Sequence, residues 1–202
     1  MLNSCIPLIF ESILAEMYLQ KMLDKKIAVD AMAVSTVIDS HARNGDVESA
    51  SKVLTKMLDM KVKPSIAMFN AMIHSCAMYE DENRFCTGDK FEATHWLNRA
   101  RELNLTPDAY TYTNLLHLAA QNHDADAACD YFVQMVQNKF TPSIECANAV
   151  VDVYTKILQP RRGISFFNKF QEFDVLADKI SFKIVFAACR DACMQQNPVH
   201  NM

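Results

Sequence analysis

The stretch NGDVESASKVLTKMLDMKVKPS, residues 44–65, decides the fold. Its opening Asn-Gly-Asp predicts a turn between helices, because glycine and asparagine take the left-handed backbone conformation readily. Ala50 and the large pair Val53/Leu54 follow at the spacing of one helix face, and the small residue lets that helix approach a neighbour closely. Pro64 then ends the helix and leaves the residue before it extended. The stretch therefore predicts a turn, one amphipathic helix and a stop.

The same pattern returns along the chain in four segments, three of which are 35 residues long. The second segment is eight residues longer, and an acidic, polar insertion near residues 80–87 restores its phase and predicts a longer turn. A fixed period of this length is typical of stacked helical hairpins, each of which buries its apolar face against its neighbours. We expect the repeats to span residues 31–65, 66–108, 109–143 and 144–178.

Counted from the first residue of each segment, equivalent places carry side chains of the same kind. Places 7 and 8 are large and apolar, which predicts the buried stripe of a first helix. These places hold Val37/Ile38, Met72/Ile73, Leu115/Leu116 and Val150/Val151. Place 20 is small and places 23 and 24 are large, which predicts a second helix packed closely on the first. Place 20 holds Ala50, Ala93, Ala128 and Gly163.

Both ends carry half of the pattern. Residues 1–30 form a partial repeat that contains a second helix, and residues 179–202 form a partial repeat with a first helix and a tail. The ends of a helical stack normally carry polar capping repeats, because an uncapped end leaves an apolar face in water. We therefore expect a fragment of a longer repeat protein, or ends covered by other protein subunits.

Composition excludes several classes of protein. Half of the 202 residues are apolar, and only three glycines and six prolines interrupt them, so disorder and an all-β sandwich are disfavoured. No stretch approaches the roughly 18–20 apolar residues of a membrane-spanning helix, and the start lacks the basic region of a signal peptide. The seven cysteines have neither metal-site nor disulfide-framework spacing, so we expect reduced, buried thiols.

Motifs of catalysis are absent from the sequence. No glycine-rich phosphate loop, nucleophile elbow, catalytic carboxylate pair or HExxH occurs. His74 and His117 share place 9 with Asp39 and Asp152, but ligands one repeat apart are too widely spaced for a single metal ion. We therefore expect no enzyme, no cofactor or metal, no membrane partner and no small-molecule substrate.

Residues 44–65 and the hydrophobic-aromatic-Asn that follows them resemble the pentatricopeptide repeat in its plain 35-residue form. The resemblance implies an all-α fold, a right-handed α-α solenoid of helical hairpin repeats. It also implies that each repeat reads about one base of single-stranded RNA. The implied role is organelle RNA processing, stability or translation, in a mitochondrion or plastid.

The resemblance places the base-reading residues at the fifth and last positions of each repeat. These pairs are Ser35/Ser65, Asn70/Asp108, Thr113/Ser143 and Asn148/Asp178. The Asn/Asp pairs imply uracil, Thr113 points to a purine, and the serine pair decides nothing, so the implied tract is N-U-purine-U. Asn70 and Asn148 could instead be polar residues that cap the first turns of their helices.

Two further places have a role in the family. The second place, where a side chain stacks on a base, holds Met32 and Tyr110 in two repeats but Glu145 in the fourth. The thirteenth place, often basic and near phosphate, holds Arg43 and Lys156. Glu145 and the formal net charge of −4 favour an alternative, a structural adaptor subunit of a mitochondrial ribosome or another assembly that contacts protein or RNA without base-specific reading.

Overall fold

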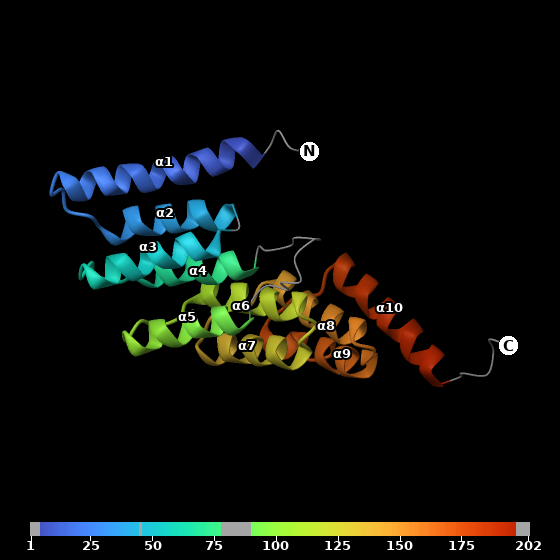
Figure 1. Cartoon of the computed structure of the whole chain (residues 1–202). Coiled ribbons are helices and arrows are strands. Elements are labelled where there is room, and N and C mark those ends of the chain that lie inside the picture. The colour runs from blue at the N-terminus through green and yellow to red at the C-terminus, as the bar shows by residue number, and fades with distance from the viewer. Residues whose placement is uncertain (1–4, 45, 78–89, 197–202) are drawn as a thin grey trace. The chain divides into compact units, whose positions relative to one another are not determined.

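The computed structural model describes residues 5–44, 46–77 and 90–196 (Figure 1). Over these ranges the chain forms ten α-helices and one 3-10 helix and contains no strand. This confirms the predicted all-α class. The insertion expected near residues 80–87 and the tail after residue 196 lie outside the described residues.

The helices alternate in the order that the segments predict. The helix ahead of the first complete segment is α1 (Cys5–Asp24). The first helices of the five following segments are α2 (Ala31–Arg43), α4 (Ile66–Ala77), α6 (Ala109–Gln121), α8 (Ile144–Lys156) and α10 (Lys179–Gln196). The second helices are α3 (Val47–Asp59), α5 (Lys90–Glu102), α7 (Ala125–Gln137) and α9 (Pro160–Phe167), the last followed by the 3-10 helix η1 (Phe170–Phe173).

The chain divides into two compact units, residues 1–114 and residues 115–202. In the first unit α2 packs against α1, α3 and α4, and α5 packs against α4. In the second unit α8 packs against α7, α9 and α10, and α10 also packs against α9. A first helix therefore contacts both the second helix of its own segment and a neighbouring segment, as expected for stacked hairpins.

A left-handed residue ends every second helix. Lys26, Lys61, Asn104, Lys139 and Asp174 all have φ between 55° and 64°. The next residue donates its backbone N–H to the carbonyl five residues earlier, as Val62 does to Met57 at 3.0 Å. This is the helix-ending motif that satisfies carbonyls left over at a helix C-terminus. The five positions are 35 residues apart, except across the second segment, where the spacing is 43.

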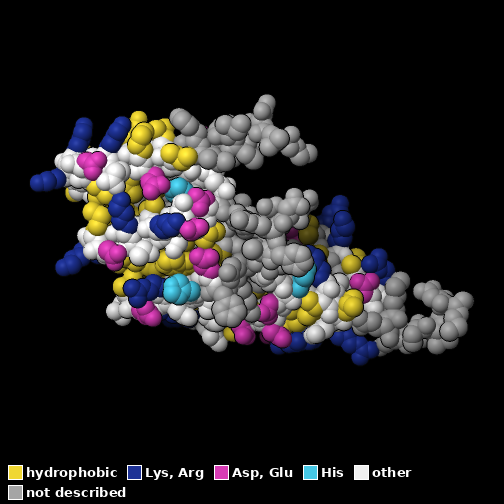
Figure 2. Space-filling model, in the orientation of Figure 1, with side chains coloured by type: hydrophobic (Ala, Val, Ile, Leu, Met, Phe, Trp, Pro, Cys, Tyr) yellow, Lys and Arg dark blue, Asp and Glu magenta, His cyan; other side chains and the backbone are white. Residues whose placement is uncertain are grey.

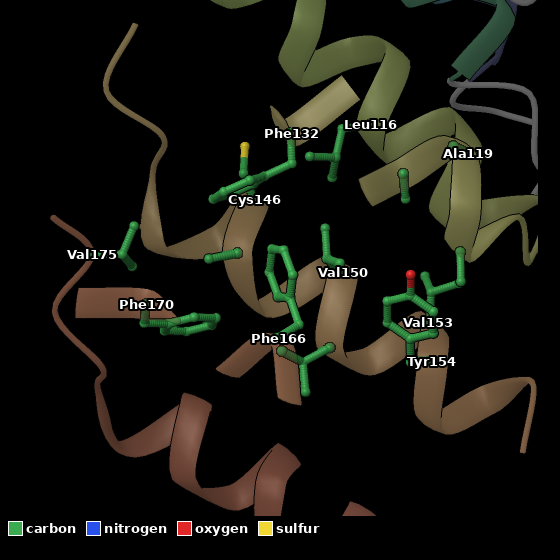
Figure 3. Close-up of a cluster of buried hydrophobic side chains, with 14 of the residues drawn as sticks. Leu116, Ala119, Phe132, Cys146, Val150, Val153, Tyr154, Phe166, Phe170 and Val175 are labelled. Carbon is green, nitrogen blue, oxygen red and sulfur yellow. The ribbon is translucent and has the colours of Figure 1, made fainter. Parts of the chain in front are cut away.

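The core of the first unit lies where the apolar places predict it. Val37, Ile38, Met72 and Ile73 are all buried, with exposed fractions of 5% or less. In the second unit Phe166 lies in the aromatic core, its ring centroid 5.1 Å from that of Phe132 and 6.0 Å from that of Phe170 (Figure 3).

Gly163 shows why place 20 is small. A Cβ atom at this residue would lie 3.1 Å from the carbonyl oxygen of Val151 and 3.2 Å from the Cβ of Tyr154, both on α8. The second helix of this segment is also broken, because a 3-10 turn follows α9. The sequence predicts one continuous helix there, whereas the turn buries Phe170, which is 2% exposed.

The expected burial of the thiols holds for only some of the described cysteines. Cys76 and Cys146 are buried and Cys129 is half-buried. Cys189 and Cys193 are exposed on α10, so the expectation of burial is wrong for these two. None of the described helices is long and apolar enough to cross a membrane.

Candidate nucleic-acid interface

The structure brings Asn70 and Asp108 together. Nδ2 of Asn70 on α4 donates to Oδ1 of Asp108, the residue before α6, at 3.1 Å. Asn70 is buried, with an exposed fraction of 4%. The carboxylate accepts only, so it fixes the amide with its nitrogen toward Asp108 and its oxygen turned away. The fifth and last places of this segment therefore form one hydrogen-bonded pair.

Thr111 completes this pair as a third polar residue. Its hydroxyl donates to Oδ1 of Asn70 at 2.6 Å, and its side chain is fully buried. Its backbone N–H donates to Oδ1 of Asp108 at 2.9 Å, and the backbone N–H of Asp108 donates back to the Thr111 hydroxyl at 3.1 Å. This reciprocal cap anchors the start of α6. We call Asn70, Asp108 and Thr111 the first triad.

The first triad leaves two groups for a ligand. The hydrogen bonds to the Asp108 carboxylate all reach Oδ1, so Oδ2 has no partner among the described residues. The amide nitrogen of Asn70 has two hydrogens, and one of them is used by Asp108. One amide hydrogen of Asn70 and one carboxylate oxygen of Asp108 are therefore left over from the bonds within the triad.

The second unit holds the corresponding pair, Asn148 and Asp178, with Ser181 in the place of Thr111. The Asn148 side chain lies close enough to the Asp178 carboxyl to help lower its pKa. Asp178 accepts the backbone N–H of Ser181 at 2.7 Å and its hydroxyl at 2.8 Å. We call these three residues the second triad. The backbone N–H and then the hydroxyl of Ser181 hold the pKa of Asp178 below its usual value of 3.8, because both bonds favour the charged carboxylate.

The two triads differ at the amide oxygen. Oδ1 of Asn148 is buried and has no hydrogen-bond partner in the described part of the chain. Oδ1 of Asn70 accepts the Thr111 hydroxyl. A buried acceptor without a partner costs about 1–3 kcal/mol, so the second triad is less well satisfied.

The Ser35/Ser65 pair is not joined in this way. The Ser35 hydroxyl donates to the Met32 carbonyl at 2.9 Å, and no hydrogen bond between Ser35 and Ser65 occurs in the described residues. The Thr113 hydroxyl donates to the Ala109 carbonyl at 2.9 Å.

Ser143, the partner predicted for Thr113, accepts the backbone N–H of Cys146 at 3.2 Å and so caps α8. Thr113 and Ser143 belong to different units.

The residue at the last place of a segment caps the helix that follows it in four cases. Asp30 accepts the backbone N–H of Ala33 at 2.8 Å, and Asp108, Ser143 and Asp178 make the equivalent bonds to the residue three positions later. The alternative that Asn70 caps its own helix is wrong, because its amide donates to Asp108 and its amide oxygen accepts from Thr111.

The predicted stacking residues are accessible. Met32 is 75% exposed and Tyr110 is 51% exposed. The Tyr110 ring lies 6.1 Å from that of His74, at an interplanar angle of 41°. Such side chains can pack on the face of an unstacked base.

The predicted phosphate contacts are already paired with acids. Nε of Arg43 lies 2.9 Å from Oδ2 of Asp39, and Nζ of Lys156 lies 2.8 Å from Oδ2 of Asp152. Each acid stands one helical turn earlier, at place 9. On the face that Figure 2 shows, Lys and Arg side chains lie beside Asp and Glu side chains over the described surface. Phosphate would have to compete with these carboxylates.

Thr111 and Ser181 are the site residues that the sequence prediction missed. Both stand at the third place of the segment that follows an Asn/Asp pair. The signal was present as Asp-x-x-Thr and Asp-x-x-Ser, which is the spacing of a reciprocal helix cap. Met68 and Cys146 stand at this place after the two pairs that lack Asn/Asp.

Helical hairpins at a near-constant period define a helical repeat protein, and in one segment a polar pair links the fifth and last residues. The chain matches the family model described as the pentacotripeptide-repeat region of PRORP over residues 20–197. It therefore belongs to the pentatricopeptide-repeat family, as the resemblance predicts.

Two curated relatives cover most of the chain but little of their own length. A mitochondrial 15S rRNA processing factor of Candida tropicalis is 27% identical over 124 residues, which are 61% of this chain and 16% of that protein. A chloroplastic pentatricopeptide repeat-containing protein of Arabidopsis thaliana is 27% identical over 137 residues, 67% of this chain and 17% of that protein. The chain thus spans less than a fifth of each relative.

Solved structures share the fold. The pentatricopeptide-repeat domain of Arabidopsis thaliana protein-only RNase P 1, in complex with tRNA, has a TM-score of 0.69 at 16% identity and covers 82% of this chain and 83% of that chain. A pentatricopeptide repeat protein in complex with an 18-nucleotide psaJ RNA element has a TM-score of 0.63 at 16% identity and covers 89% and 26%. These likenesses confirm the predicted class of helical-hairpin solenoid.

Proposed function

We propose that this chain is a binding module for single-stranded RNA in which Asn70/Asp108 and Asn148/Asp178 read bases. The hydrogen-bonded Asn70/Asp108 pair carries the proposal. Its free amide hydrogen and free carboxylate oxygen can meet a carbonyl oxygen and a ring N–H of a base. Uracil has a carbonyl oxygen next to a ring N–H, and the family resemblance implies uracil at both Asn/Asp pairs. We call Asn70/Asp108 and Asn148/Asp178 the two readers. The proposed tract is N-U-purine-U, with the purine implied by Thr113.

The names of the relatives support a role in an organelle. One is a mitochondrial 15S rRNA processing factor and the other is chloroplastic. Two similar structures hold RNA, a tRNA in one and a psaJ element in the other. We therefore propose organelle RNA processing, stability or translation, in a mitochondrion or plastid.

Binding by this chain alone should be weak. Four stacked bases contribute about 4–12 kcal/mol in total at roughly 1–3 kcal/mol each. Association costs roughly 4–15 kcal/mol. The net charge of −4 and the pairing of Arg43 and Lys156 with acids reduce the attraction for phosphate. Further repeats or partner subunits would supply the remaining affinity.

We further propose that the chain binds RNA without cleaving it. Two of the similar structures are RNase P proteins, but the family model that matches describes a repeat region. In the ranges described, no three His, Cys, Asp or Glu side chains gather as a metal site requires. Incubation of the chain with labelled RNA and Mg²⁺ should leave the RNA intact.

A structural adaptor is the second candidate. The acids that pair with Arg43 and Lys156, together with the exposed Glu145 at a stacking place, favour a surface that contacts protein or folded RNA by shape. In that case the Asn/Asp pairs serve only to cap and join helices.

Fluorescence anisotropy with short RNAs separates the two candidates. RNA with uracil opposite both readers should bind more tightly than the same RNA with adenine there. Asn70→Thr and Asn148→Thr should shift the preference toward a purine, and Asn98→Thr on the exposed face of α5 should leave it unchanged. Equal binding of all RNAs would favour the adaptor.

A further inference from the structure

The hydroxyl of Thr111 has one proton and two possible acceptors. Oδ1 of Asn70 lies 2.6 Å away, and Oδ1 of Asp108 lies 2.9 Å away. The Asp108 oxygen already accepts the amide of Asn70 and the backbone N–H of Thr111. The hydroxyl therefore donates its proton to Oδ1 of Asn70, which is the nearer of the two oxygens and accepts no other hydrogen bond among the described residues.

This bond closes a ring of three residues. Asn70 donates to Asp108, Asp108 holds the start of α6 through Thr111, and Thr111 donates back to Asn70. Rotation of the Asn70 amide would break bonds at both of its ends. The remaining Nδ2 hydrogen therefore points in a fixed direction.

The second triad leaves this ring open. The Ser181 hydroxyl donates to Asp178 at 2.8 Å, and Oδ1 of Asn148 stays without a partner among the described residues. Threonine carries a second heavy atom on Cβ that restricts χ1, whereas serine rotates more freely. No hydrogen bond among the described residues therefore holds the oxygen end of the Asn148 amide.

We propose that the third-place hydroxyl of the following repeat is a positioning residue for base reading. Thr111 clamps Asn70, whereas Ser181 leaves Asn148 unclamped. The Asn70/Asp108 reader therefore discriminates between bases more sharply than the Asn148/Asp178 reader does. This inference rests on the proposed function, because it concerns the selectivity of the same two pairs.

Selectivity at each reader tests the inference on the full chain. Anisotropy competition with RNAs that differ in one base gives the ratio of Kd values, uracil against each other base, separately opposite each reader. The wild-type ratio should be larger at Asn70/Asp108. Thr111→Val should reduce that ratio about three- to tenfold, the value of one lost hydrogen bond, and leave the other reader unchanged. Thr55→Val, whose hydroxyl bonds only within α3, is the matched control.

Two further variants keep the test decisive if Thr111→Val folds poorly. Thr111→Ser should lower the ratio toward that of the second reader. Ser181→Thr should raise the ratio at Asn148/Asp178. Unchanged ratios in both variants, in a wild-type chain that does select uracil, would overturn the clamp and leave the proposed function standing. Loss of all base selectivity in the wild-type chain overturns both.

A measurement without RNA separates these failures. Side-chain amide hydrogen exchange, followed by NMR in the free chain, should be slower for Asn70 than for Asn148. Thr111→Val should remove the difference, and Thr55→Val should retain it. Equal exchange of the two amides in the wild-type chain would contradict the clamp whatever RNA binds.

Discussion

The two triads place the same Asn/Asp pair in different surroundings. Asn70 and Asn148 are both more than nine-tenths buried, and each interacts with an aspartate that caps the next helix. The first triad satisfies both ends of its amide, whereas the second leaves the amide oxygen without a partner among the described residues. Identical residues at the fifth and last places therefore do not give identical sites, because a third residue on the next helix differs in the bonds that it makes to the amide.

The largest effect expected from this difference follows loss of the aspartate. Asp108→Ala removes the cap of α6 and the partner of a buried amide, and these losses are worth about 1 and about 1–3 kcal/mol. The free energy of unfolding of the first unit should fall by about 2–4 kcal/mol. Asp178→Ala should cost the second unit less, because its amide is already half unsatisfied.

Native-state hydrogen exchange measures the two losses separately, since it reports on each helix. Asp59→Ala, an exposed residue at the end of α3, is the control and should cost little. Equal losses at Asp108 and Asp178 would mean that the Thr111 bond adds nothing to the first triad.

A double-mutant cycle should show the missing bond directly. Asn70→Ala and Thr111→Val remove the two ends of the 2.6 Å hydrogen bond, so their coupling energy should be about 1 kcal/mol. Asn148→Ala and Ser181→Ala share no direct bond and should be additive within about 0.5 kcal/mol. Urea unfolding of each single and double variant gives both values. A coupling between Asn148 and Ser181 as large as that of the first pair would contradict the structural difference.

The apolar periodicity predicted the helices because buried residues recur at the same places of each segment. It did not predict where each second helix ends, since Lys26, Lys61 and Lys139 take a left-handed conformation that sequence reasoning assigns to glycine or asparagine. The apolar periodicity also did not predict the break after α9. Its aromatic spacing suits a continuous helix as well as a 3-10 turn.

The site was predicted only in part. The repeat register alone predicted that Asn70 and Asp108 form a pair, because they stand at the fifth and last places of one segment. The structure places them within hydrogen-bond distance. The role of Thr111 needs a contact across helices that no period reveals. The pairing of Lys156 with Asp152 could have been predicted, since opposite charges four residues apart meet on a helix surface.

Leu158 belongs to the same unit as the second triad and has a strained backbone conformation. It has φ 60° in the turn before α9, which costs a branched residue roughly 1–2 kcal/mol. Leu158→Gly should therefore raise the stability of the second unit by about 0.5–1 kcal/mol, after the greater chain entropy of glycine is offset. Thermal unfolding followed by circular dichroism measures the change.

Side-chain amide exchange of Asn148 should stay fast in Leu158→Gly, because the strain lies in another turn. Leu176→Gly, also exposed but without a positive φ, should not stabilise. Slower exchange of Asn148 in Leu158→Gly would assign the open triad to the strained turn and not to Ser181.

The smallest expected effect is a shift in the pKa of Asp178. Hydrogen bonds from Ser181 lower the pKa of Asp178 below 3.8, so the charged form contributes stability above the unfolded value and loses it as pH falls through the folded value. Ser181→Ala removes the hydroxyl bond but keeps the larger backbone bond, so the pKa of Asp178 should rise only part of the way to 3.8. Carboxyl carbon shifts followed by NMR between neutral and acidic pH measure it. An unchanged pKa would mean that the hydroxyl does not donate to Asp178, and its proton would then be available to Asn148 and the two triads would be alike.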